Sequence, residues 1–141
     1  MIPKPTASLV INYFYLWKRE EKTGQDNGTK DRPCLVLSAE LSGSAMNVIV
    51  APITTIKSDL SEAVEIPQAV IKHLGLKEEK PSYIVCTEVN TFVWPGFDIS
   101  PVGDKGQFVF GFLPPKLFEQ VKEKIAGYDK QKKLKVVSRN D

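Results

Sequence analysis

Two side chains of this 141-residue sequence are of the types that phosphate chemistry needs. Arg32 carries a planar guanidinium that stays charged and matches the geometry of a phosphate group. Pro33 restrains the residue before it to an extended backbone, so we expect Arg32 to be held at the start of the apolar run CLVLS at 34–38. Thr54 follows the apolar run MNVIVA at 46–51 and offers a hydroxyl that can donate to a phosphate oxygen.

Pairing of the two apolar runs would bring Arg32 and Thr54 together. The link between the runs includes Ser-Gly-Ser at 42–44, which is typical of an antiparallel hairpin. In such a hairpin the start of the first strand and the end of the second lie side by side, so the two side chains are predicted neighbours. The residue types alone leave a structural alternative open. Arg before Pro at a strand start is commonly a surface salt-bridge residue, and Thr after a strand is commonly a turn or cap residue.

The remaining pattern predicts a mainly β protein of the α+β class. Aromatic and β-branched enrichment indicates strands, and apolar residues at helical spacing indicate two helices. The whole chain, 1–141, is expected to form one domain, a small barrel capped by a helix, with a core over about 9–126 and flexible termini. Besides the hairpin, the predicted elements are strands at 9–17, 63–66, 83–92 and 107–112, loops at 18–31 and 95–106, a short helix from Pro67 to a stop at Gly75, a helix at 116–126 closed by Gly127, and a polar tail in which LKVV at 134–137 can add an edge strand.

Composition excludes several classes of protein. Hydrophobic content of 42% and charged content of 26% are ordinary for a globular protein and argue against disorder. No apolar run approaches the ~20 residues of a membrane-spanning helix, and the N-terminal apolar stretch is too short for a signal peptide, so we expect a cytoplasmic protein without membrane contact. The net charge of +2 does not by itself indicate a nucleic-acid binder.

The sequence predicts neither a metal nor another cofactor. Cys34 and Cys86 lie inside apolar runs, which indicates buried free thiols in a reducing compartment. Together with the single histidine, His73, they cannot form a four-ligand zinc site without carboxylates. His73 lies on the short predicted helix, which we expect to face away from the cleft.

Four segments, in this order and spacing, resemble the PemK/MazF toxin family. They are GTKDRPCLVLS at 28–38, VIVAPITT at 48–55, the strand from Ile84 to Glu88 followed by Asn90 and Trp94, and FGFLPPKLFEQV at 110–121. The resemblance implies an SH3-like barrel, a homodimer and metal-independent endoribonuclease activity on single-stranded messenger RNA. It also implies an antitoxin partner that blocks the RNA site, and it assigns catalysis to the Arg and Thr of the motifs, here Arg32 and Thr54.

Other residues are weaker candidates for this site. Val85 and Thr87 stand where well-known members have a charged side chain, so Glu88 is predicted as a general base, with a structural carboxylate as the alternative. Trp17 and Phe92 are expected to pack in the core or a dimer interface. The predicted RNA contacts are Lys30 at a phosphate, Thr55, Asn90 and an exposed Trp94 that stacks on a base.

Two other functions are weighed against the ribonuclease. The first is a non-catalytic SH3-like module that binds RNA or a protein, which the missing charge at positions 85–87 favours and the intact Arg32 and Thr54 disfavour. The second is a gyrase inhibitor similar to the CcdB toxins. Those act through their C-terminal residues, whereas this tail is rich in lysine and ends in Asn-Asp, so this function ranks last.

Overall fold

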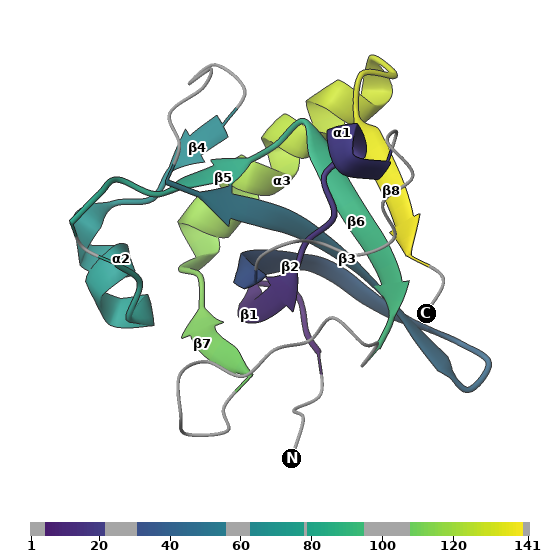
Figure 1. Cartoon of the computed structure of the whole chain (residues 1–141), viewed down its shortest axis with the longest axis horizontal. Helices are drawn as coiled ribbons and strands as arrows, with labels where there is room; N and C mark the ends of the chain where they lie inside the picture. The colour runs from purple at the N-terminus through teal and green to yellow at the C-terminus, as the bar shows by residue number, and fades with distance from the viewer. Residues whose placement is uncertain (1–4, 22–30, 56–62, 78, 95–107, 140–141) are drawn as a thin grey trace.

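The computed structural model describes residues 5–21, 31–55, 63–77, 79–94 and 108–139. Within these residues, eight strands form one sheet, and three helices accompany it (Figure 1). The mainly β prediction is therefore confirmed. The predicted loop at 95–106 and Lys30 lie outside the described residues. Within the described chain, no helix is both long enough and apolar enough to cross a membrane.

The centre of the sheet is the predicted hairpin. Strand β2 (Asp31–Ser42) pairs antiparallel with β3 (Ala45–Thr54), and Gly43 supplies the positive φ of 65° in the tight turn between them. Both strands extend beyond the apolar runs that predicted them, so Arg32 and Thr54 lie on strand rather than beside it. The hairpin prediction is thus confirmed, and its arms are longer than expected.

Neighbouring strands cover both sides of this hairpin. On one side of the hairpin, β1 (Leu9–Phe14) pairs with β2. The other edge of β1 pairs with β7 (Val109–Phe112). On the other side, β6 pairs with the first half of β3 and β5 with its end, so the strand predicted over 83–92 is broken into two. The additional strands are β1 (Leu9–Phe14), β4 (Ala63–Glu65), β5 (Tyr83–Val85), β6 (Glu88–Val93), β7 (Val109–Phe112) and β8 (Lys135–Arg139).

The edge strand in the C-terminal tail is confirmed. β8 pairs with β6, in parallel, and Figure 1 shows it alongside that strand. Its Val137 and Arg139 are buried, so this part of the tail is packed on the sheet rather than frayed. The described strands form an open path from β7 to β4 and β8, with no pairing between those ends. Among the described residues this ladder is therefore an open sheet, and it does not by itself show a closed SH3-like barrel.

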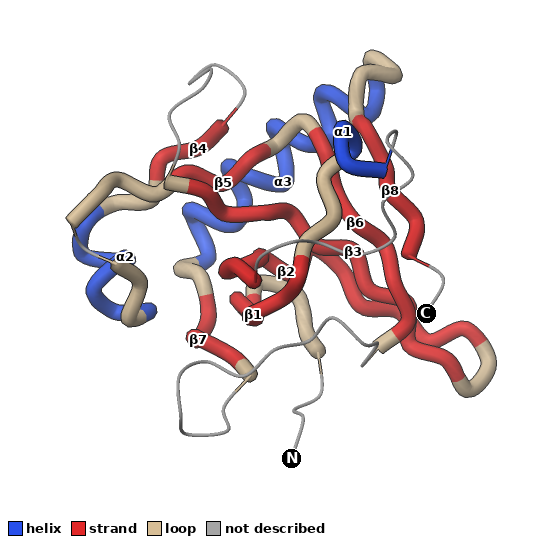
Figure 2. Tube along the Cα trace, viewed as in Figure 1, coloured by secondary structure: helices blue, strands red, loops and turns tan. Residues whose placement is uncertain are grey.

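The helices follow their local signals in part. α2 (Gln68–Leu74) begins after Pro67 and ends at Gly75, whose φ of 74° is the left-handed stop that the sequence predicted. α3 (Pro115–Lys130) continues past Gly127, which was expected to end it. α1 (Lys18–Glu21) is a short helix inside the predicted loop, and Figure 2 shows the irregular segment that joins it to β1.

Two apolar clusters lie on opposite faces of the sheet because successive strand residues point to opposite sides. One cluster joins the strands to α2 and α3, with Val10, Ala51 and Val121 among its buried members. The other contains the aromatic residues that follow one face of β1 and its continuation, together with Phe92. As predicted, Cys34 and Cys86 are buried free thiols and Trp17 and Phe92 are core residues.

Candidate functional site

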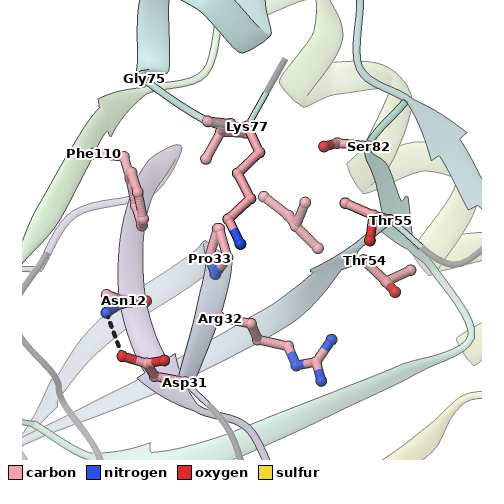
Figure 3. Close-up of a pocket in the computed structure, with 12 residues that line it drawn as sticks. Asn12, Asp31, Arg32, Pro33, Thr54, Thr55, Gly75, Lys77, Ser82 and Phe110 are labelled. Carbon is pink, nitrogen blue, oxygen red and sulfur yellow. Dashed lines mark hydrogen bonds between the residues drawn. The ribbon is translucent and has the colours of Figure 1, made fainter. Parts of the chain in front are cut away.

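A pocket of about 320 Å³ opens where β2 begins and β3 ends (Figure 3). The hairpin supplies one wall, and the connection between α2 and β5 supplies another. The lining contains both polar and apolar side chains, which suits a ligand with both characters. The lining residues are Asn12, Asp31, Arg32, Pro33, Ile53, Thr54, Thr55, Gly75, Leu76, Lys77, Ser82 and Phe110.

Arg32 and Thr54 both line this pocket, as the hairpin argument predicted. Cys34 pairs with Pro52 in the ladder, and the same register continued by two residues places Arg32 level with Thr54. Figure 3 draws the Arg32 guanidinium and the Thr54 hydroxyl on the same side of the pocket. Thr55 is exposed at its rim, so a hydroxyl and a guanidinium can reach one bound group.

Arg32 is held by an aromatic ring. Its guanidinium carbon lies 5.1 Å from the centre of the Trp17 ring, and the guanidinium carbon of Arg19 lies 4.9 Å from the same ring. The Arg32 Nε is buried and has no hydrogen-bond partner within the described part of the chain. Stacking on a ring does not consume N–H donors, so this arrangement places a charge without occupying the fork that binds a phosphate.

The pocket carries more positive than negative side chains. Among its lining residues, Arg32 and Lys77 are basic and Asp31 is acidic. One Asp31 carboxylate oxygen accepts a hydrogen bond of 2.9 Å from the Asn12 amide. Figure 3 draws the Lys77 side chain reaching into the pocket from the opposite wall. Sequence reasoning missed Lys77, since nothing local distinguishes it from other surface lysines. Only the packing of the α2–β5 connection brings it opposite Arg32.

Glu88 and Asn90 lie elsewhere, buried on β6, and neither is among the residues that line this pocket. The Glu88 carboxylate accepts hydrogen bonds of 3.0 Å from the Tyr15 hydroxyl and from the Lys18 backbone N–H. The Asn90 amide accepts one of 2.9 Å from the Leu16 N–H and donates one of 2.8 Å to the Leu16 carbonyl. These contacts fit the structural alternative for Glu88, and they give Asn90 no surface with which to touch RNA in this conformation.

Trp94 and His73 also lie outside this pocket. Trp94 is half-buried, with its ring 6.2 Å from that of Phe92, and it does not line the pocket. His73 is exposed on α2 and is likewise absent from the lining.

Burial suppresses the ionisation of the nucleophilic side chains near the hairpin. It raises the pKa of the Cys34 thiol well above its usual range, against the opposing charge of Arg32, and raises the pKa of Cys86 to about 11. Burial and the neighbouring Glu88 carboxylate likewise raise the pKa of the Tyr15 phenol far above its usual range. None of the three is an activated nucleophile, and the basic and hydroxyl groups that line the pocket are those of Arg32, Lys77, Thr54, Thr55 and Ser82.

Comparison with protein-family models matches residues 15–127 to the PemK-like, MazF-like toxin of type II toxin–antitoxin systems. The chain belongs to this family. No curated protein matches it. The matched residues contain every residue that lines the pocket except Asn12. The pocket is therefore part of the PemK/MazF-like domain, and membership places the chain on the toxin side of a type II system, which implies an antitoxin partner.

Proposed function

We propose that this chain is a toxin that cleaves single-stranded RNA, without a metal, in the pocket that holds Arg32 and Thr54. The observation that carries the proposal is the meeting of these two side chains in one positively charged pocket of a PemK/MazF-like domain. Growth inhibition would follow from the loss of messenger RNA. Residues 28–38 and 48–55, from which the family resemblance was recognised, supply both side chains.

The reaction needs no group beyond the RNA and the protein. The ribose 2′-oxygen attacks the adjacent phosphorus and forms a new P–O bond, while the bond from phosphorus to the 5′-oxygen of the next nucleotide breaks. The 2′-hydroxyl gives its proton to solvent water and the departing 5′-oxygen takes one from solvent water, which leaves a 2′,3′-cyclic phosphate and a 5′-hydroxyl. Arg32 stabilises the charge that accumulates on the phosphoryl oxygens, and the Thr54 hydroxyl donates to one of them. Lys77 adds positive charge from the opposite wall.

The remaining family properties are proposed with the same reaction. A cytoplasmic toxin of this kind acts as a homodimer and is inhibited by an antitoxin that covers the RNA site. Its sheet would form the SH3-like barrel of the family. In support, contacts such as the hydrogen bond of 3.3 Å from Arg139 of β8 to the Tyr13 hydroxyl of β1 link strands that are far apart in the ladder. Thr55 is proposed to contact RNA at the rim, and Lys30, two residues before Arg32 in the sequence, is proposed to contact a phosphate.

Conservative variants of the two proposed catalytic residues test the proposal. Thr54→Val removes the hydroxyl and should slow cleavage of a long single-stranded RNA by about 10²-fold, as loss of one transition-state donor does elsewhere. Thr54→Ser should retain most activity. Arg32→Lys keeps the charge but loses the fork and should be strongly impaired, and Arg32→Gln should be inactive.

Thr91→Val is the matched control, because Thr91 is a half-buried threonine of β6 that does not line this pocket. It should cleave at the wild-type rate. Folded Thr54→Val and Arg32→Lys proteins that also cleave at that rate would contradict the proposed site. RNA binding by wild type without any cleavage would instead favour the non-catalytic module.

A further inference from the structure

We propose that Trp17 is a positioning residue for Arg32, and that Glu88 and Asn90 act on the reaction by holding Trp17 in place. The inference rests on the proposed function for its catalytic consequence, although the placement of Arg32 can be measured without RNA. It gives a role to two buried polar residues of β6 that do not reach the pocket themselves.

The first step is the contact between Trp17 and Arg32. Buried polar atoms are normally fixed by hydrogen bonds, yet the Arg32 Nε is buried without a partner in the described chain. The guanidinium instead lies over the Trp17 ring, 5.1 Å from its centre. An arginine side chain has several rotatable bonds, and packing against a buried aromatic surface restricts them. The ring is therefore the restraint that the structure shows on the position of the charge.

The second step is the anchoring of Trp17. The ring is nearly buried, but its backbone lies in the segment between β1 and α1, beyond the ladder (Figure 2). Asn90 binds both backbone groups of the preceding residue, Leu16, and Glu88 accepts from the N–H of the following residue, Lys18. Two β6 side chains thus hold the chain on either side of Trp17.

The third step is the support behind this clamp. The Tyr15 ring meets the Trp17 ring edge-on, with centroids 5.0 Å apart and planes at 69°, and its hydroxyl donates to Glu88. From β8, a nitrogen of the buried Arg139 guanidinium lies 3.5 Å from the Asn90 oxygen and 3.1 Å from the Phe14 carbonyl oxygen. Several polar contacts from different strands therefore fix the segment that carries Trp17.

A positioning role predicts a specific kinetic pattern. Loss of the ring frees the guanidinium, and misplacement of a catalytic group by about 1 Å can cost ~10²-fold in rate. The charges of Arg32 and Lys77 remain near the pocket, so RNA binding should change much less. Trp17→Leu should thus lower kcat by about 10²-fold with a KM within a few-fold of wild type. Trp17→Phe, which keeps a ring face, should restore most of kcat.

Nuclear magnetic resonance of the free protein tests the placement independently of activity. The Arg32 Nε–H signal, assigned by its loss in Arg32→Lys, should be displaced by the Trp17 ring current and exchange slowly with water. In Trp17→Leu it should move to the position of an exposed arginine and exchange faster, and Trp17→Phe should lie between. Asn90→Asp replaces the donor to the Leu16 carbonyl with an acceptor oxygen, so it breaks that hydrogen bond and should shift the Arg32 signal in the same direction.

Phe92→Leu is the control for general damage to the core. Phe92 belongs to the same apolar cluster and stacks on Tyr13 with centroids 4.5 Å apart, and among the described residues the ring under Arg32 is that of Trp17, not that of Phe92. It should lower stability while the Arg32 signal and the kcat of the folded protein stay unchanged. An Arg32 signal unmoved by Trp17→Leu, or equal kcat losses in Trp17→Leu and Phe92→Leu, would overturn the proposal. If wild type does not cleave RNA but the signal responds to Trp17→Leu, the proposed function fails and the placement of Arg32 by Trp17 stands.

Discussion

Arg32 differs from an ordinary surface arginine in two measurable ways: its Nε is buried, and its guanidinium lies against Trp17. The sequence predicted its place at a strand start through Pro33, and its meeting with Thr54 through the hairpin. Its contact with Trp17 was not predictable, because that contact depends on how the segment after β1 packs. Residue type and local restraint were readable from the chain, whereas side-chain partners across the fold were not.

Glu88 and Asn90 show the same limit. Polar residues on a strand near a predicted site suggest function, and their types fit a base and an RNA contact. The structure buries both and directs them toward the Tyr15 hydroxyl and the backbone groups of Leu16 and Lys18 instead. The direction of a strand side chain depends on the register with its neighbours, and the pairing of β6 with β3 and β8 is set by contacts distant in sequence.

The two buried thiols predict how stability responds to alkali. Burial raises the pKa of Cys34 and of Cys86 above the ordinary thiol value of 9.0, to about 11 for Cys86. Below that ordinary value, folded and unfolded chains both carry thiols, so stability is unaffected. As pH rises from about 9 toward 11, the unfolded chain ionises first and the folded state loses stability, by up to about 1.4 kcal/mol per thiol for each pH unit.

Urea unfolding at neutral pH and at about pH 10 measures this loss. Cys86→Ala should have a shallower decline with pH than wild type, because one of the contributing groups is gone. Tyr15, whose pKa is also raised, contributes in the same direction and remains in both proteins. Equal slopes for the variant and wild type would show that the Cys86 thiol does not carry the effect.

Among the secondary-structure elements, those with strong local signals were predicted best. The β2–β3 hairpin has a glycine turn between two apolar runs, and α2 has proline before it and glycine after it. α3 was predicted too short because glycine often follows the last residue of a helix and Gly127 was expected to end this one. The helix instead continues to Lys130. Partly buried Tyr128 and Leu134 pack on the apolar cluster beneath α3, which explains how tertiary contacts outweigh the weak helix propensity of one glycine.

The two glycines at these positions form a matched pair. Gly75 has a φ of +74° and Gly127 has ordinary helical geometry, while an added Cβ would meet nothing within 4 Å at either position. Gly75→Ala should therefore lower the free energy of unfolding by about 1–2 kcal/mol through backbone strain alone. Gly127→Ala should raise it by up to about 1 kcal/mol, since alanine favours the helix.

Chemical denaturation of both variants checks the sign of each change. Gly75 also lines the pocket, so its substitution can change cleavage as well as stability. The rate of RNA cleavage by Gly75→Ala should therefore be compared with that of wild type at a temperature at which both proteins are folded. A stabilising effect of Gly75→Ala would show that this position does not need the left-handed conformation. A destabilising effect of Gly127→Ala would show that the helix is not regular there.

Taken as a whole, the molecule has little excess charge, with 19 basic and 17 acidic residues, so its overall field does not indicate an RNA-binding protein. In the pocket, two basic side chains, Arg32 and Lys77, lie on opposing walls with one acidic side chain, Asp31. The family match ends at residue 127, whereas β8 begins at Lys135 and contributes Arg139 to the support of Asn90. The fold of this chain thus continues past the matched residues with a strand that pairs with β6 and contacts Asn90.

The most direct test of the account is the chemistry of the RNA ends. Cuts made by purified wild-type protein in a long single-stranded RNA are mapped in the presence of EDTA. A short RNA spanning one cut is then compared with the same RNA carrying a single 2′-deoxy nucleotide on the 5′ side of the cut bond. We expect cleavage that survives the chelator, leaves a 2′,3′-cyclic phosphate and is abolished by the deoxy substitution. Equal cleavage of the two RNAs, or no cleavage by folded protein, would contradict a metal-independent ribonuclease that uses the 2′-hydroxyl.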